Sequence, residues 1–159
     1  MSPPYEELLQ GAPTLRVSPG SRHEQICAQL HRSVRGSVAN LNSTCLLAAR
    51  TAVQVAPDTI LRPDLALMTV PNNKLWLAAE IVNSEDHAPD TVVKKQIYEE
   101  IRLPRLWMID PRYDNVEVYH ATQYGMVLKG ILAGAEVLSE KLLPEFQIVI
   151  QQLFKADVA

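Results

Sequence analysis

Asp64 and Glu80 are the two residues whose placement along the chain most clearly predicts chemistry. Glu80 is the only charged residue in the apolar run 75–82, which reads LWLAAEIV and has no helical periodicity. Such a run is typical of a strand buried on both faces. An ionised carboxylate there costs several kcal/mol unless a cation or hydrogen-bond donors compensate it. Asp64 opens the preceding strand-like run 64–70, so the two acids could share one divalent cation, for which magnesium is the expected choice.

A positively charged residue would complete such a site, because a fixed cation stabilises the negative charge of a phosphate. The sequence predicts a helix from Asp90 to Arg102, closed by Pro104. Its expected buried stripe consists of apolar residues four positions apart: Val93, Ile97 and Ile101. Lys94 and Tyr98 are expected at the edge of this stripe. We therefore predict that Lys94 directs its ammonium toward the acids and that Tyr98 is a substrate contact.

Each of these residues also has an ordinary structural interpretation. Asp64, directly after Pro63, could be a turn or capping residue, and Glu80 could form a buried ion pair with an arginine or a lysine. Lys94 could be a boundary lysine that lies along the sheet and keeps its ammonium in solvent. The metal-site hypothesis depends on the three residues occurring together, at spacings that one strand–strand–helix unit can bring to one point.

The order of predicted elements indicates an α/β fold. Helices are expected at residues 5–10, at 22–35, at 90–102 and at 148–155, the second one opened by a capping box of Ser21 and Glu24. Strand-like segments are expected at residues 14–17, 45–56, 60–62, 64–70, 74–82 and 106–110, with a hairpin from 116–120 and 126–128. We predict one domain over residues 1–159, built on a mixed β-sheet flanked by helices.

Composition limits the classes of function. The chain has 159 residues, of which 47% are hydrophobic and 21% charged, which is typical of a globular domain. Its net charge of -3 gives no general basic field for coating nucleic acid. Cys27 and Cys45 form neither a disulfide framework nor a metal-ligand spacing, as expected in a reducing cytoplasm. Because we find no signal peptide and no stretch of 18 apolar residues, we expect a cytoplasmic protein without membrane association.

The central motif resembles that of a known nuclease superfamily. Pro63-Asp64 followed by Glu80-Ile81-Val82 is similar to the PD-(D/E)XK signature, although Val82 stands where the usual lysine would be. The chain resembles more closely the Uma-two family of proposed restriction endonucleases, in which the lysine function is taken to lie on the following helix. The segment that runs from Glu80 through Lys94 to Pro111 carries this resemblance. It implies a restriction-endonuclease-like core, with Asp64, Glu80 and Lys94 as the catalytic residues of a magnesium-dependent nuclease.

The resemblance extends toward both ends of the chain. Glu7, four residues before Gly11, matches the family's N-terminal pattern, and His23 matches a histidine at the head of the next helix. The segment 143–146 is similar to the family's closing segment. Glu7 is a candidate third oxygen ligand if the first predicted helix packs near the strand ends; otherwise it is a solvated acid. His23 could position a water or a phosphate, or could be an ordinary surface residue of the helix.

Two features depart from the family pattern. Ala12 stands where many members carry an acid, and the loop 83–86 differs from the usual small turn after the glutamate. Our leading hypothesis is a metal-dependent endonuclease that hydrolyses DNA with magnesium, for which manganese can substitute, and that acts as a homodimer. The alternative is a non-catalytic binding or oligomerisation module, which the altered loop and the acidic pI favour. A third hypothesis is a hydrolase of small phosphoesters.

Overall fold

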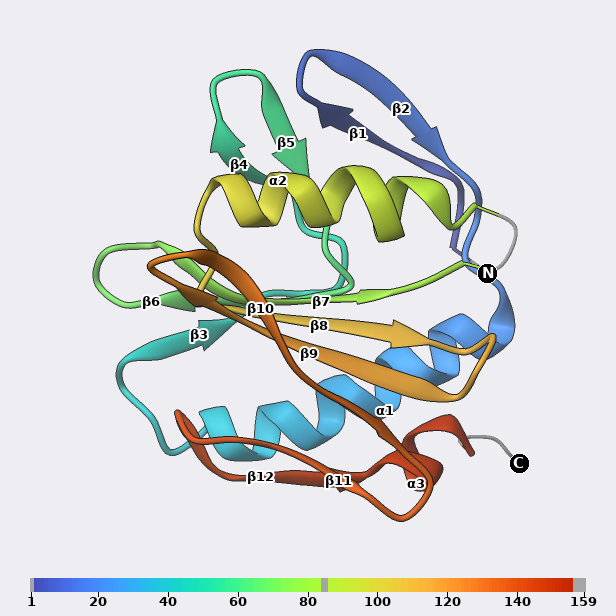
Figure 1. Cartoon of the computed structure of the whole chain (residues 1–159), viewed down its shortest axis with the longest axis vertical. Helices are drawn as coiled ribbons and strands as arrows, with labels where there is room; N and C mark the ends of the chain where they lie inside the picture. The colour runs from blue at the N-terminus through green and yellow to red at the C-terminus, as the bar shows by residue number, and fades with distance from the viewer. Residues whose placement is uncertain (1, 84–85, 156–159) are drawn as a thin grey trace.

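A mixed sheet of six strands lies at the centre of the structure, a computed structural model that describes residues 2–83 and 86–155 (Figure 1). Its strands, in spatial order, are β10 (Gly125–Ala133), β9 (Asn115–Thr122), β8 (Arg105–Asp110), β7 (Leu75–Ile81), β6 (Leu65–Thr69) and β3 (Thr44–Leu46). Neighbouring strands are antiparallel except for β7 and β8, which are parallel. A parallel pair needs a crossover connection, and the helical segment after Glu80 provides it.

Helical and strand layers cover both faces of this sheet (Figure 1). One face carries helix α1 (Ser21–Val38), the hairpin of β11 (Val137–Glu140) and β12 (Leu143–Val149), and helix α3 (Ile150–Phe154). The other carries the crossover, which consists of the π-helical turn η1 (Pro89–Lys94) and helix α2 (Lys95–Glu100). Above it lies a sheet in the order β2 (Ala12–Arg16), β1 (Tyr5–Leu9), β5 (Thr59–Leu61) and β4 (Val53–Ala56). The predicted α/β class with a mixed sheet is confirmed.

The central sheet separates two apolar cores. Leu77, Ala79 and Ile81 belong to the core on the α1 side, where Trp107 stacks on Phe146 with ring centroids 5.3 Å apart. Ala78 and Val82 belong to the core on the α2 side. Because successive side chains of a strand point to opposite faces, Glu80 faces the α2 side. The predicted apolar stripe of α1 is confirmed, since its four residues are buried: Ile26, Cys27, Leu30 and Val34.

The predicted helix at residues 5–10 is wrong. This segment is β1, which pairs antiparallel with β2 through a two-residue turn at Gln10 and Gly11. Both turn residues have positive φ angles, 52° and 85°, which is the geometry that joins tightly turned strands. Glu7 and Leu9 are buried while Leu8 is not, so the segment has the period of a strand. Gly11 ends no helix; it closes a hairpin.

Other boundaries also differ from the prediction. The predicted strand 45–56 is two strands, β3 and β4, separated by a turn in which Arg50 has a φ of 61°. The capping box is absent among the described contacts, because Gly20 is the N-cap and Glu24 binds Arg50 instead. The predicted terminal helix begins only at Ile150, after β12. Across residues 2–83 and 86–155, no helix is both long and apolar enough to cross a membrane.

Candidate active site

Glu80 accepts two buried hydrogen-bond donors on one oxygen. Lys94 Nζ lies 2.7 Å from Glu80 Oε2, and the Tyr98 hydroxyl donates to the same oxygen at 2.5 Å. Lys94 and Tyr98 are fully buried, and Glu80 is 1% exposed. The predicted helix stripe is therefore corrected: Asp90, Lys94 and Tyr98 face the sheet together with Ile97. A lysine can take this position because carboxylates compensate its charge there.

Glu7 supplies the second carboxylate for Lys94. Lys94 Nζ lies 2.7 Å from Glu7 Oε2, which also accepts the backbone N–H of Arg62 at 2.7 Å. The other oxygen of Glu7 lies 2.7 Å from Arg16 Nη1. Glu7 lies in the middle of β1, and both of its oxygens are engaged by donors. It thus lies next to the site, as a partner of cations.

Arg16 connects this group to the start of the crossover. Its guanidinium lies 2.9 Å from an oxygen of Asp90 and 2.8 Å from one of Asp86. The sequence predicted a helix that begins at Asp90; this residue lies within η1, is 2% exposed and pairs with Arg16 of β2. A π-helical turn is rare and often occurs at functional sites. Here it brings Asp90 and Lys94 together onto the buried side of the crossover.

Asp64 lies directly before β6, at the level of Glu80 on the neighbouring strand. Leu65 pairs with Ala79 in the antiparallel register, so the next residues along are Asp64 and Glu80. One oxygen of Asp64 accepts the backbone N–H of Ile81 at 2.8 Å, and the other lies 2.8 Å from Arg50 Nη1. The register thus places Asp64 and Glu80 opposite each other on neighbouring strands.

His23 lies between two oxygens of this group. Its Nε2 is 3.0 Å from the carbonyl oxygen of Ile81 and 3.5 Å from Asp64 Oδ2, and its side chain is 10% exposed. Burial lowers the pKa of His23, but the hydrogen bond to Asp64 and the charge of that carboxylate outweigh it and raise the pKa above the usual value. The imidazole thus occupies a place that attracts positive charge.

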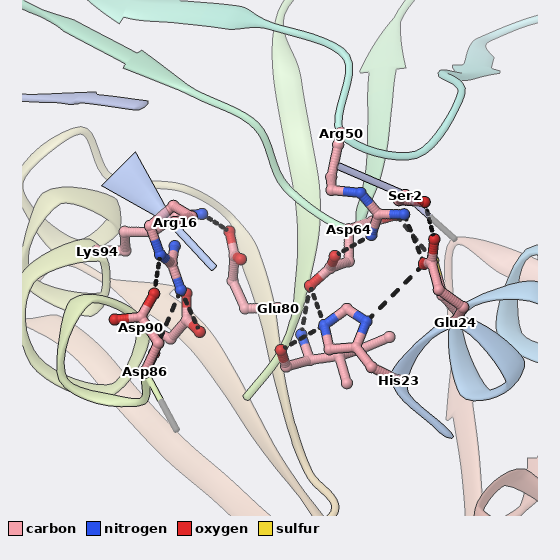
Figure 2. Close-up of polar contacts among 12 residues, drawn as sticks. Ser2, Arg16, His23, Glu24, Arg50, Asp64, Glu80, Asp86, Asp90 and Lys94 are labelled. Carbon is pink, nitrogen blue, oxygen red and sulfur yellow. Dashed lines mark hydrogen bonds and ion pairs between the residues drawn. The ribbon is translucent and has the colours of Figure 1, made fainter. Parts of the chain in front are cut away.

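Arg50 is a site residue that the sequence did not indicate. Its guanidinium bridges Asp64 and Glu24, with Nη2 2.5 Å from Glu24 Oε1. The backbone N–H of Arg50 donates to Pro63 O at 2.9 Å, which holds the turn against the residue before Asp64. A non-glycine residue with positive φ is uncommon and carries strain. Figure 2 shows the resulting arrangement, in which Glu80 lies between Lys94 on one side and Asp64 on the other.

The two central acids have opposite electrostatic character. Burial raises the pKa of Glu80, and Lys94 only partly opposes this because Asp90, Glu7 and Asp64 add further negative charge. Burial also acts to raise the pKa of Asp64, but His23, the Ile81 N–H and Arg50 outweigh it and lower the pKa to about 2. Lys94 keeps its proton in either state of Glu80, since Glu7 is a second acceptor. Asp64 is therefore firmly anionic, whereas the charge of Glu80 is incompletely compensated.

The donor chemistry fits a magnesium ion. Four acids of this site are buried, Glu7, Asp64, Glu80 and Asp90, whereas three cations pair with them: the buried Arg16 and Lys94, and Arg50, whose side chain is 14% exposed. An additional cation would offset this excess of buried negative charge. Within the described part of the chain, no three His, Cys, Asp or Glu side chains form a ready metal-binding group, unlike a zinc site. Magnesium commonly uses one or two carboxylates and keeps several waters, a donor set that Asp64 and Glu80 could supply.

An open cavity of about 560 Å³ is lined by His23, which contacts Asp64, and by Val82, which follows β7. Its lining also includes two exposed arginines, Arg22 and Arg112. Arg22 pairs with Asp114, and Arg112 pairs with Asp110. Of the divergent loop 83–86, Ser84 and Glu85 lie outside the described residues, whereas Asn83 lines this cavity. The cavity gives a ligand access to the end of β7.

The structure thus sorts the predicted site residues into two adjoining groups. Glu80, Lys94, Tyr98 and Glu7 share hydrogen bonds in the first group, and Asp64 and His23 belong to the second. The backbone of Ile81 links the groups, because its N–H binds Asp64 and its carbonyl contacts His23. The sequence missed the cations that partner the acids from distant segments, Arg16 and Arg50. No local pattern marks these two arginines.

Two comparisons with known proteins match nearly the whole chain. A solved structure of a "putative nuclease belonging to DUF820" from Anabaena variabilis superimposes with a TM-score of 0.76, covering 95% of this chain and 90% of that one. The two sequences are 18% identical, so this likeness shows the fold alone. Among curated proteins, none matches the chain. The model of the Uma2 family, described as "Putative restriction endonuclease", matches residues 3–151, so the chain belongs to this family.

Proposed function

We propose that this protein is a magnesium-dependent endonuclease that hydrolyses phosphodiester bonds of DNA, and that manganese can substitute. One observation carries the proposal: Asp64 and Glu80 are buried side by side at one end of adjacent strands, among more acids than buried cations. Membership of a family described as "Putative restriction endonuclease" supports it, because nucleases of this kind act on DNA and generally use divalent metals.

Asp64 and Glu80 would hold the metal ion. A bound divalent ion supplies a Lewis acid and a more acidic water for attack on phosphorus. Asp64 is prepared for this role, because the Ile81 N–H and Arg50 fix its carboxylate in an ionised state. The carboxylate of Glu80 has donors on Oε2 only, among the described contacts, so Oε1 is available as a ligand atom.

Lys94 would stabilise negative charge on the phosphate or orient the attacking water. It is suited to this role because it stays protonated and has Glu7 as a second charged partner beside Glu80. Tyr98 is fully buried and donates its hydroxyl to Glu80. We therefore propose that Tyr98 positions Glu80, in place of the direct substrate contact expected from the sequence.

His23 and the adjoining cavity would receive the substrate. The two exposed arginines of its lining, Arg22 and Arg112, can donate to backbone phosphates. His23 lines the cavity and also lies 3.5 Å from Asp64. In this proposal it orients a water or a phosphate oxygen beside the acids.

The experiment that tests this proposal is cleavage of supercoiled plasmid DNA with magnesium or manganese. We expect Glu80→Gln to abolish cleavage while circular dichroism shows an unchanged fold. Glu6→Gln is the matched control, because Glu6 lies next to Glu7 on β1 but is exposed. Removing its charge should leave the rate within about twofold, as for a surface site. Cleavage by Glu80→Gln at the wild-type rate would contradict the role of Glu80.

A non-catalytic binding or oligomerisation module is the second candidate. The observation in its favour is that Arg50 and Lys94 already pair with Asp64 and Glu80 in this structure. A calorimetric titration with manganese separates the two, because the module would show no binding that depends on these carboxylates. Nucleotides and small phosphoesters assayed beside duplex and single-stranded DNA test the third hypothesis, a small-phosphoester hydrolase.

Assembly belongs to the same proposal. Enzymes that cut both strands of a duplex commonly use two copies of one site, which are related by a two-fold axis. We therefore propose a homodimer, which light scattering of the purified protein tests directly. A monomer that still linearises plasmid DNA would contradict the need for pairing.

A further inference from the structure

Each acid proposed to bind the metal shares its cation with a second acid. We call Asp64 and Glu80 the inner acids, and Glu24 and Glu7 the outer acids. Lys94 Nζ lies 2.7 Å from Glu80 and 2.7 Å from Glu7. Arg50 lies 2.8 Å from Asp64 and 2.5 Å from Glu24. The same acid–cation–acid arrangement thus occurs twice, once on each side of the candidate metal position.

The outer acids are anchored by contacts that do not involve the inner ones. Glu7 accepts the backbone N–H of Arg62 and lies 2.7 Å from Arg16 Nη1. Glu24 lies in the first turn of α1 and accepts the hydroxyl of Ser2 on its other oxygen. The outer carboxylates can therefore stay in place when the inner ones change partners.

This arrangement bears on how a divalent ion can enter. A cation that pairs with an acid competes with a metal for the same oxygens, and a buried cation left without any partner is strongly unfavourable. If Lys94 and Arg50 had only the inner acids as partners, metal binding would leave both cations uncompensated. With an outer acid present, each cation keeps one charged partner while the inner acid turns to the metal.

We propose that Glu7 and Glu24 are positioning residues, which retain Lys94 and Arg50 beside the site when Glu80 and Asp64 bind a divalent ion. The inference rests on the proposed function, since it assumes that the inner acids are the metal ligands. In this proposal Glu7 holds Lys94 in place. This role replaces that of a third oxygen ligand, for which the sequence made Glu7 a candidate. It also makes Glu24 and Arg50 parts of the site, although neither was predicted.

A double-mutant cycle on manganese affinity tests the first of these pairs. Binding of Mn²⁺ is measured by calorimetry for wild type, Glu7→Gln, Lys94→Met and the double variant. We expect Glu7→Gln to weaken binding about tenfold, in the range of coupling between contacting residues. In the Lys94→Met background the same change should alter affinity less than about twofold, because no ammonium remains to be retained. Glu6→Gln, which removes an exposed charge from the same strand, should change affinity less than about twofold.

A simple field effect gives a different result. If Glu7 acts only through its negative charge, Glu7→Gln will weaken manganese binding by the same factor with and without Lys94. Equal factors in the two backgrounds therefore overturn the positioning role. If the wild-type protein binds no manganese at all, the proposed function itself fails, which is a separate and recognisable outcome.

The second pair gives an independent cycle for the case in which Lys94→Met does not fold. Side chains of Glu24 and Arg50 are 30% and 14% exposed, so their removal leaves less buried charge unpaired. Glu24→Gln is expected to weaken manganese binding several-fold in the wild-type background and less than about twofold beside Arg50→Met. Equal effects in both backgrounds overturn the proposal for this pair.

Discussion

Removing Lys94 should destabilise the apo-protein far more than removing Glu80, although the two side chains form one ion pair. Lys94 is fully buried and is 2.7 Å from each of two carboxylates. Lys94→Met would leave Glu80 with only the Tyr98 hydroxyl among its described partners. Breaking a buried pair in this way costs about 3–5 kcal/mol, a large fraction of the 5–15 kcal/mol that stabilises a typical domain.

Glu80→Gln removes the other partner with a different consequence. Lys94 keeps Glu7, so no buried cation is left alone. The substitution also removes a carboxylate whose pKa is raised by burial and by neighbouring acids, which marks its charge as unfavourable. We expect a change in the free energy of unfolding of at most about 1 kcal/mol, in either direction, because the large cost of breaking a buried pair comes from the uncompensated charge left behind, and Lys94 keeps Glu7 as its partner.

Urea unfolding at pH 7.5 in EDTA measures both changes. The buried Trp76 and Trp107 report the transition by fluorescence. We expect the midpoint for Lys94→Met to fall well below that of wild type and the midpoint for Glu80→Gln to stay close to it. Equal losses for the two variants, or a larger loss for Glu80→Gln, would refute the argument that Lys94 serves two acids and Glu80 is under-compensated.

Two further predictions concern acid and metal. The pKa of Asp64 is lowered from 3.8 to about 2, so this group contributes stability above pH 4 that is lost as pH falls toward 2. Integrated over that window, the loss of unfolding free energy is about 2 kcal/mol. Asp64→Asn should flatten this part of a plot of unfolding free energy against pH. An unchanged slope in the variant would show that other groups cause the acid dependence. Manganese at about 100 times its dissociation constant should raise the free energy of unfolding by about 2.7 kcal/mol. Glu80→Gln should abolish this protection, and protection that persists in the variant would place the ion elsewhere.

The parts of the fold that follow local rules could be predicted from the sequence. The apolar run that contains Glu80 is β7, and the 3.6-residue period of Ile26, Leu30 and Val34 is the buried face of α1. The first strand could not be recognised, because a five-residue segment followed by Gln10-Gly11 fits a helix end as well as a hairpin turn. Pairing with β2 and β5 decides between them, and that pairing is not local.

The site shows the same division. Asp64, Glu80 and Lys94 stand out because their charges interrupt or border apolar patterns, and the structure brings two of them into direct contact. Arg16 and Arg50 carry no such signal. Arg16 meets Asp90 across 74 positions of sequence, and Arg50 meets Asp64 only because a turn with positive φ divides a segment expected as one strand. Cation partners of buried acids thus depend on tertiary packing.

The most direct measurement is a crystal structure of the protein soaked with manganese, examined by anomalous scattering. A peak bridging carboxylate oxygens of Asp64 and Glu80, at roughly 2.2 Å from each as expected for a small hard cation, is the predicted result. Lys94 and Arg50 should then remain on Glu7 and Glu24. A protein that cleaves DNA with manganese while its metal lies away from both acids would contradict the account.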